Sequence, residues 1–207
     1  MTHYTVAIIV PKKLLTDIEG YAVHQMAPFD EAIKVSPYVC DSVEKATADL
    51  AASIQRMERI ISRQDANYEI DKCIAKLGEL RLITPEQYYR DRIKCYEDFN
   101  DRGEPISTYN PLSKWDWYVI GGRWDGWIND RETSANAVAD NLSTTEEVVV
   151  REKVPHAIIT PDGQWHERGQ MGWWAILLTE TPDWDRNALD LFRQYRGHHV
   201  VIVDAHI

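Results

Sequence analysis

Residues 114–127 read Lys-Trp-Asp-Trp-Tyr-Val-Ile-Gly-Gly-Arg-Trp-Asp-Gly-Trp, and the rest of the chain is organised around them. Four of the eight tryptophans lie in this stretch. Aromatic and β-branched residues favour a strand on a half-buried sheet surface, and a glycine pair favours a turn or the close approach of a backbone or a ligand. The stretch therefore predicts two short strands, 115–120 and 123–127, that join at Gly121 and Gly122.

Apolar spacing on either side of this centre predicts the other elements. Apolar alternation or continuous apolar runs indicate strands at 3–10, 155–161, from 165, at 173–179 and at 199–206. Helical spacing indicates helices at 12–24, 42–63, 84–102 and 182–195, the third starting with the Thr-Pro-Glu-Gln pattern of a capping box, and a weaker helix at 64–82. Between them we expect an extended segment at 26–39, a loop at 104–113, and a surface segment at 129–150 with one helical turn.

This order of elements predicts an α+β fold with a mainly antiparallel sheet and helices on one face. A ferredoxin-like sandwich is the most specific topology that fits the order. The helices at 42–102 then form an insertion within a single domain of 1–207.

Composition limits the kinds of partner. The chain has 207 residues, is 44% hydrophobic and carries a formal net charge of −10, which argues against general binding of duplex DNA or RNA. Three widely spaced cysteines predict reduced thiols. No apolar run approaches the roughly 20 residues of a membrane span. We expect a cytoplasmic protein with no membrane contact and no cofactor, and the sequence leaves a homo-oligomer open.

Acidic residues and a histidine near the two ends are candidates for metal binding or acid–base chemistry. Asp30 and Glu31 are adjacent, which fits either a cation site or a solvated turn. Asp204 and His206 are two apart on a predicted strand and share a face, so they could hold a metal or form a carboxylate–imidazole pair. The alternative is a terminal strand with a hydrogen-bonded histidine.

The tryptophan-rich centre is the candidate ligand site. Trp115 and Trp117 are expected to share one strand face, with Asp116 and Tyr118 on the other. Arg123 follows the glycine pair and could stack on a ring or bind an anion, with Asp116 or Asp125 as an internal alternative partner. The candidate ligand-binding residues are Phe29, Lys114, Trp115, Trp117, Tyr118, Gly121, Gly122, Arg123, Trp124, Trp173 and Trp174. Packing of these aromatic residues in the core is the competing interpretation.

Four stretches carry a resemblance: Pro28-Phe-Asp-Glu, the centre from Lys114 to Trp124, Met171-Gly-Trp-Trp, and Asp204-Ala-His-Ile. Together they resemble a family of uncharacterised bacterial and phage proteins, in which a cysteine usually stands where this chain has Ala205. The resemblance implies that the four stretches meet in space, and it leaves 42–102 mostly unmatched. It implies no activity. Some phage proteins of this size sequester nucleotide immune signals, which is an analogy of class only.

Three functions remain open from the sequence. The first is binding of a small anionic aromatic ligand derived from a nucleotide, without turnover. The second is a metal-dependent nucleotide hydrolase or phosphodiesterase that uses Asp30, Glu31, Asp204 and His206. The third is inhibition of a partner protein through an exposed tryptophan surface. We favour the first, because the sequence contains no recognisable nucleophile and no complete set of metal ligands.

Overall fold

The structure, a computed structural model, describes residues 2–64, 67–130, 136–169 and 180–207. The chain divides into two compact units: unit 1 comprises Met1–Lys34 and Tyr109–Ile207, and unit 2 comprises Val35–Thr108. Both contain helices and strands, which confirms the predicted α+β class. The predicted helical insertion at 42–102 lies within unit 2.

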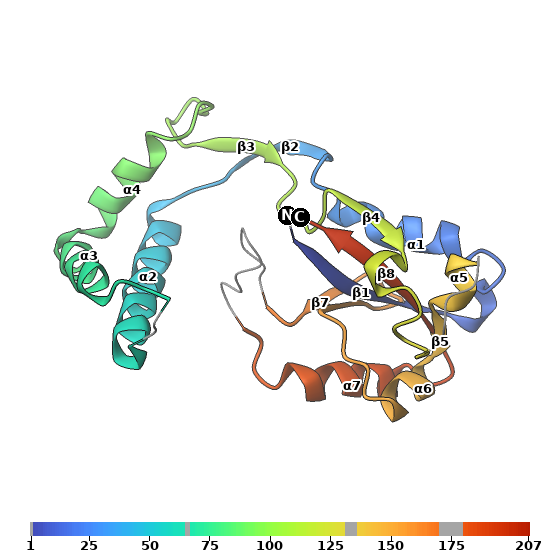
Figure 1. Cartoon of the computed structure of the whole chain (residues 1–207). Helices are drawn as coiled ribbons and strands as arrows, with labels where there is room; N and C mark the ends of the chain where they lie inside the picture. The colour runs from blue at the N-terminus through green and yellow to red at the C-terminus, as the bar shows by residue number, and fades with distance from the viewer. Residues whose placement is uncertain (1, 65–66, 131–135, 170–179) are drawn as a thin grey trace. The chain divides into compact units, whose positions relative to one another are not determined.

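Unit 1 holds a mixed sheet with helices around it (Figure 1). Its strands are β1 (His3–Val10), β4 (Trp117–Ile120), β5 (Leu142–Thr144), β6 (Ala157–Ile159), β7 (Trp165–Glu167) and β8 (His199–His206). Its helices are α1 (Ile18–Met26), α5 (Ala137–Asp140), α6 (Thr145–Val150) and α7 (Trp184–Gln194), with 3-10 turns at Lys12–Leu14, Ala27–Phe29 and Gly122–Trp124.

The sheet is centred on the first and last strands of the chain. Its order is β4-β8-β1-β6-β7, and β5 also pairs with β8. Strands β1 and β8 are antiparallel along their whole length, from His3 opposite His206 to Val10 opposite His199. Figure 1 shows them side by side, with the N- and C-termini together at one end. The other pairs are antiparallel except β1 with β6, so the prediction of a mainly antiparallel sheet is confirmed.

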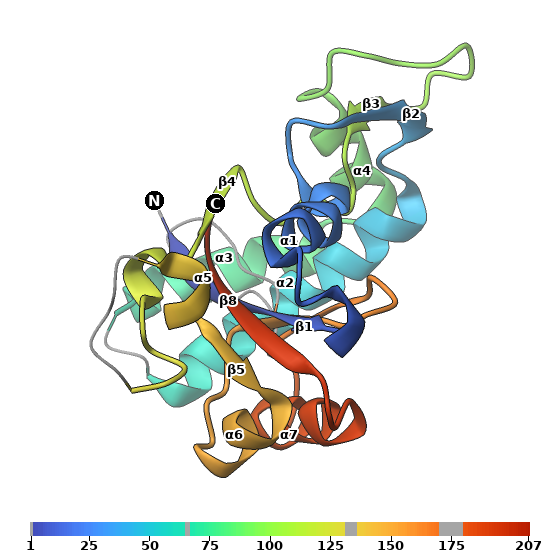
Figure 2. The same ribbon diagram turned by 90° about the vertical axis from the view of Figure 1, so that its right-hand side faces the viewer.

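Helices cover both faces of the sheet, whereas the sequence predicts one face. Helix α1 packs on the face formed by Val6, Ile8 and Val203. Helices α6 and α7 pack on the opposite face, and both views of the fold show them across the sheet from α1 (Figures 1 and 2). The reason lies in β1 and β8, because both strands carry apolar residues on both faces and bury nearly every residue.

The ferredoxin-like topology is not found. That fold interleaves its βαβ units so that neighbouring strands are antiparallel. Here β1 and β6 are direct parallel neighbours, although β4 and β5 of the same sheet come between them in the chain.

Unit 2 holds the helices α2 (Val43–Arg63), α3 (Ile70–Leu82) and α4 (Pro85–Ile93), and all but the end residues Lys34 and Tyr109 of the paired strands β2 (Lys34–Val39) and β3 (Ile106–Tyr109). The Thr84–Gln87 capping box is present at the start of α4. That helix ends at Ile93 instead of continuing to 102. The buried Asp41 carboxylate accepts a hydrogen bond from the Tyr96 hydroxyl and pairs with Arg92, and so anchors the chain beyond α4.

Two further predictions need correction. Residues 123–127 are not a strand, because the chain makes a 3-10 turn at Gly122–Trp124 where the glycine dihedrals depart from extended backbone. The segment 129–150 contains the predicted helical turn as α5, but β5 and α6 follow it. A capping box between Thr144 and Glu147 starts α6, and Val148 anchors it in the core.

Candidate functional site

A row of polar and aromatic side chains crosses one end of the sheet. His3, His206 and Trp117 lie directly opposite one another on β1, β8 and β4. The next row along the strands holds Thr5 and Asp204. Alternation along β8 places Asp204 and His206 on the same face as Val200 and Ile202, which pack under α7. One sheet face therefore changes from apolar to polar as it approaches the chain termini.

His3 is held by a buried carboxylate. Its Nδ1 lies 2.9 Å from Oδ1 of Asp204, whose side chain is only 2% exposed. The second carboxylate oxygen, Oδ2, accepts a hydrogen bond of 3.0 Å from the backbone N–H of Arg123. Both oxygens of Asp204 are thus satisfied, which offsets the cost of burying the charge.

His206 has a carboxylate partner of its own. Its Nδ1 lies 2.5 Å from Oδ1 of Asp116, and the backbone N–H of Asp116 donates to the His206 carbonyl. The Trp117 ring stacks on the His206 ring at a centroid distance of 5.4 Å and an angle of 16°. The His3 ring stands edge-on to both, 5.0 Å from His206 and 5.2 Å from Trp117. We call His3, His206 and Trp117 the His–Trp surface.

The predicted pair of Asp204 with His206 is wrong in its partners. The two residues share a face as expected, but Asp204 orients His3 and Asp116 orients His206. A carboxylate on Nδ1 favours the tautomer that carries its hydrogen there, which leaves the Nε2 lone pair for a proton or a ligand. Neither Nε2 atom has a hydrogen-bond partner among the described residues.

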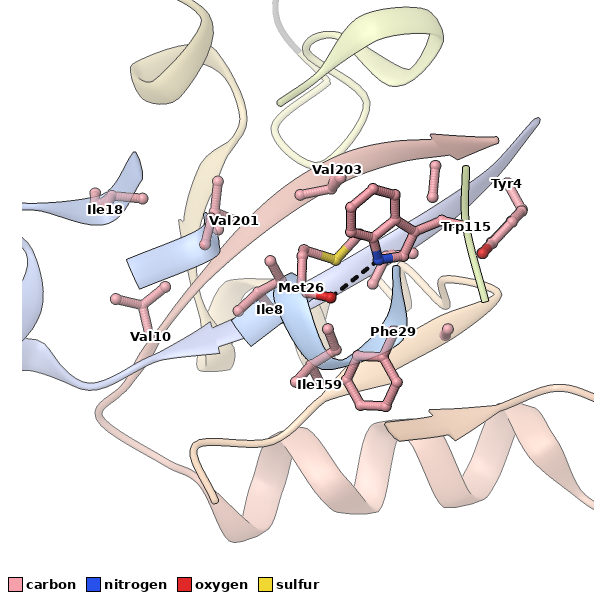
Figure 3. Packing of buried hydrophobic residues seen from close by; sticks show 14 residues of the cluster. Tyr4, Ile8, Val10, Ile18, Met26, Phe29, Trp115, Ile159, Val201 and Val203 are labelled. Atoms are coloured by element: carbon pink, nitrogen blue, oxygen red, sulfur yellow. Dashed lines mark hydrogen bonds between the residues drawn. The ribbon is translucent and has the colours of Figure 1, made fainter. Parts of the chain in front are cut away.

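Trp115 belongs to the core, on the other face of the sheet. It is 8% exposed and contacts Tyr118 edge-on at 4.8 Å, and its indole N–H donates to the Met26 carbonyl oxygen (Figure 3). Phe29 is buried in the same cluster. The expectation that Trp115 and Trp117 share a face is wrong, because β4 begins only at Trp117 and the alternation does not extend back to Trp115.

The glycine pair serves the fold. Gly122 has φ +56°, and a Cβ there would lie 2.6 Å from Oδ2 of Asp204 and 2.8 Å from Cγ1 of Val119. Gly121 has φ +76°, and a Cβ there would lie 2.6 Å from Oδ1 of Asp125. The space beside these residues is filled by side chains of the protein, so the pair allows close packing rather than the approach of a ligand.

Lys114 lies at a different place, beside a surface pocket. Its Nζ donates to Oε1 of Glu167 at 2.8 Å, and the Trp165 indole N–H donates to the other carboxylate oxygen. The pocket has a volume of about 480 Å³ and is also lined by Phe29 and Gln164. The Lys114 charge is therefore already paired, which weakens the expectation that it binds a ligand phosphate.

The remaining candidates differ in exposure. The Arg123 side chain is exposed and has no ion-pair partner among the described residues, so neither Asp116 nor Asp125 is its internal partner. Trp124 is half-buried against the core under α7, and its indole nitrogen is buried with no hydrogen-bond partner in the described part of the chain. Trp173 and Trp174 lie outside the described residues.

The proposed metal ligands do not assemble. Asp30 accepts the backbone N–H of Ala32 in a local turn. Within residues 2–64, 67–130, 136–169 and 180–207, no group of three or more histidine, cysteine or acidic side chains is placed to hold a metal ion. Over the same ranges, no helix combines the length and the apolar character needed to cross a membrane.

His3 as a site residue, and Asp116 as the partner of His206, were missed from the sequence, although β1 carried a signal. Along one face β1 reads His3-x-Thr5-x-Ala7, which mirrors the order Ile202-x-Asp204-x-His206 on β8. Antiparallel pairing of two such strands brings their polar ends together. For Asp116 there was no signal, since alternation assigned it to the other face.

Three of the four stretches that carry the family resemblance meet in the fold. Lys114 N–H donates to the Phe29 carbonyl, and Asp116 N–H donates to the His206 carbonyl, so the centre bridges the first and last stretches. The Met171–Trp174 stretch lies outside the described residues. No protein-family model, curated protein or solved structure matches the chain.

Proposed function

We propose that the His–Trp surface binds a small anionic ligand that carries an aromatic ring, such as a mononucleotide. The observation that carries the proposal is Trp117, a residue that is 43% exposed although its ring packs against His206 and His3. An exposed ring that is already ordered stacks on a planar ligand with little further loss of conformational entropy.

Two groups that suit an anion, the imidazoles of His3 and His206, lie against this ring. Each imidazole has its Nδ1 engaged by a carboxylate, so a protonated ring can present its Nε2–H to a phosphate oxygen. The backbone N–H of Arg123 donates to Asp204, and its exposed guanidinium has no ion-pair partner among the described residues and can bind an anion. These groups provide donors for a phosphate beside a stacking face.

The net charge of −10 favours a small ligand over a polymer. A nucleic-acid chain places many phosphates against the protein and needs a broad basic face. A mononucleotide needs only local compensation of its charge.

Calorimetric titration with AMP tests the proposal. Stacking on an aromatic side chain contributes about 1–3 kcal/mol per base, so Trp117→Ala should raise Kd by roughly 5- to 150-fold. Trp165→Phe is the matched control, because Trp165 lines the pocket beside Lys114. Loss of AMP binding in Trp165→Phe but not in Trp117→Ala would assign the ligand to that pocket and contradict the proposal.

The other functions have less support. A metal-dependent hydrolase that uses Asp30 and Glu31 lacks a ligand set in the described residues. The AMP titration also distinguishes ligand binding from docking of a partner protein on Trp117, because docking requires no binding of AMP. A role for a phage protein against host immunity stays a prediction.

A further inference from the structure

We propose that His3 and His206 form a metal-independent general acid–base pair that cleaves a phosphodiester bond of a nucleotide bound at the His–Trp surface. This inference rests on the proposed function, because the bound base would hold the phosphodiester beside the two rings. It differs from simple binding in requiring both imidazoles.

The arrangement of the two rings carries the inference. They belong to opposite ends of the chain, yet the β1–β8 register places them directly opposite each other, 5.0 Å apart between centroids. Each ring is fixed through Nδ1 by a separate carboxylate, Asp204 or Asp116. Two independent carboxylate–imidazole pairs thus lie on one sheet face, and each engages the Nδ1 atom of its ring and not the Nε2 atom.

The carboxylate of Asp204, the two imidazoles and the Trp117 ring differ in burial, as the proposed acid–base reaction requires. Asp204 is closed in by Gly122 and the backbone of Arg123, so it cannot reach a ligand and acts only through His3. The side chains of His3 and His206 are 10% and 6% exposed, so protein surrounds most of each ring and only a small part of it faces solvent. Trp117, beside them, is the exposed member.

The reaction balances with a hydroxyl nucleophile, either water or the ribose 2′-hydroxyl. One neutral imidazole accepts the hydroxyl proton on Nε2 while that oxygen bonds to phosphorus. The bond from phosphorus to the leaving oxygen breaks, and the other ring, initially protonated, donates its Nε2 proton to the leaving oxygen. Proton exchange with solvent restores the pair.

Asp116 and Asp204 are positioning residues in this scheme. Each holds the tautomer that frees Nε2 and stabilises the imidazolium when it forms. Asp116→Asn keeps an oxygen near Nδ1 but removes the charge. We therefore expect Asp116→Asn to lower kcat with little change in KM, which loss of a purely structural contact would not do.

The test uses the full chain with the dinucleoside monophosphate ApA and its 2′-deoxy form, in the presence of EDTA. We expect wild-type protein to cleave ApA, and His3→Gln and His206→Gln each to lower kcat by about 100-fold or more. His24→Gln, on the exposed side of α1, is the matched control and should leave the rate unchanged. Cleavage of both forms identifies water as the nucleophile, and cleavage of ApA alone identifies the 2′-hydroxyl.

Binding measurements separate this inference from the proposed function. ApA or AMP that binds to wild type but is returned intact overturns the acid–base pair and leaves the binding function standing. Absence of binding overturns both. Cleavage that needs an added metal ion, or that survives both histidine substitutions, also overturns the inference. If His206→Gln fails to fold by circular dichroism, His3→Gln at the end of β1 decides the outcome.

Discussion

Replacing Gly122 with alanine should destabilise unit 1 by more than a positive φ angle alone explains. The added Cβ would lie 2.6 Å from Oδ2 and 2.7 Å from Cβ of Asp204. Asp204 has no room to retreat, because it is 1% exposed and its carboxylate holds both His3 and the backbone of Arg123.

The magnitude follows from two contributions. A left-handed backbone costs an alanine roughly 1–2 kcal/mol. Overpacking against fixed neighbours costs about 1–3 kcal/mol more. Gly197 supplies the matched control, since its φ is +83° and a Cβ there meets nothing within 4 Å. Gly197→Ala should therefore show only the first cost, and the two variants should differ by about 1–3 kcal/mol.

Urea unfolding followed by tryptophan fluorescence measures this difference. All eight tryptophans fall within the residue ranges of unit 1, so their fluorescence reports its unfolding and not that of unit 2. Equal losses in Gly122→Ala and Gly197→Ala would refute the reasoning. In that case the glycine pair would be needed for its dihedrals, and the space beside Asp204 would be open to a ligand.

Three further predictions concern other parts of unit 1. Trp115→Ala should cost about 3–5 kcal/mol in unfolding free energy, whereas the exposed Trp117→Ala should cost much less, as measured by urea unfolding. Thr144→Ala removes the N-cap of α6 and should cost about 0.5–2 kcal/mol by the same measurement. Burial lowers the pKa of His156 below its ordinary value of 6.5. The unfolded chain then binds a proton that the folded chain does not, so stability should fall as pH drops from about 7 to 5; His156→Gln should flatten this slope, and the exposed His24→Gln should not.

The fold class was predictable because its signals are local. The alternation in β1 and β8, the helical spacing in α2 and α7, and the Thr84 capping box each depend on residues close in sequence. The coverage of both sheet faces by helices could also have been inferred, since β1 is apolar on both of its faces for most of its length.

The composition of the site was harder to predict because it depends on register. Trp115 and Trp117 lie on opposite faces of the sheet because strand β4 begins only at Trp117. The strand begins where the His206 carbonyl accepts a hydrogen bond from the backbone N–H of Asp116. That contact joins residues 90 positions apart, and no local pattern encodes it. The partner of His3 was hidden for the same reason, since Asp204 lies 201 positions away.

The role of the glycine pair was ambiguous from the sequence. A Gly-Gly turn beside an arginine fits a ligand-binding loop as well as a tightly packed turn. Only the positions of Asp204 and Asp125 show which side chains fill the space that a Cβ would need.

The most direct test of the His–Trp surface is an NMR titration of the histidine rings with AMP. Long-range ¹H–¹⁵N spectra resolve the imidazole nitrogens of the seven histidines. If the surface binds AMP, the Nε2 signals of His3 and His206 should shift together with saturation, while those of His24 and His166 stay in place. Saturable binding of AMP that leaves His3 and His206 unmoved, or that shifts His166 beside Glu167 instead, would contradict the account.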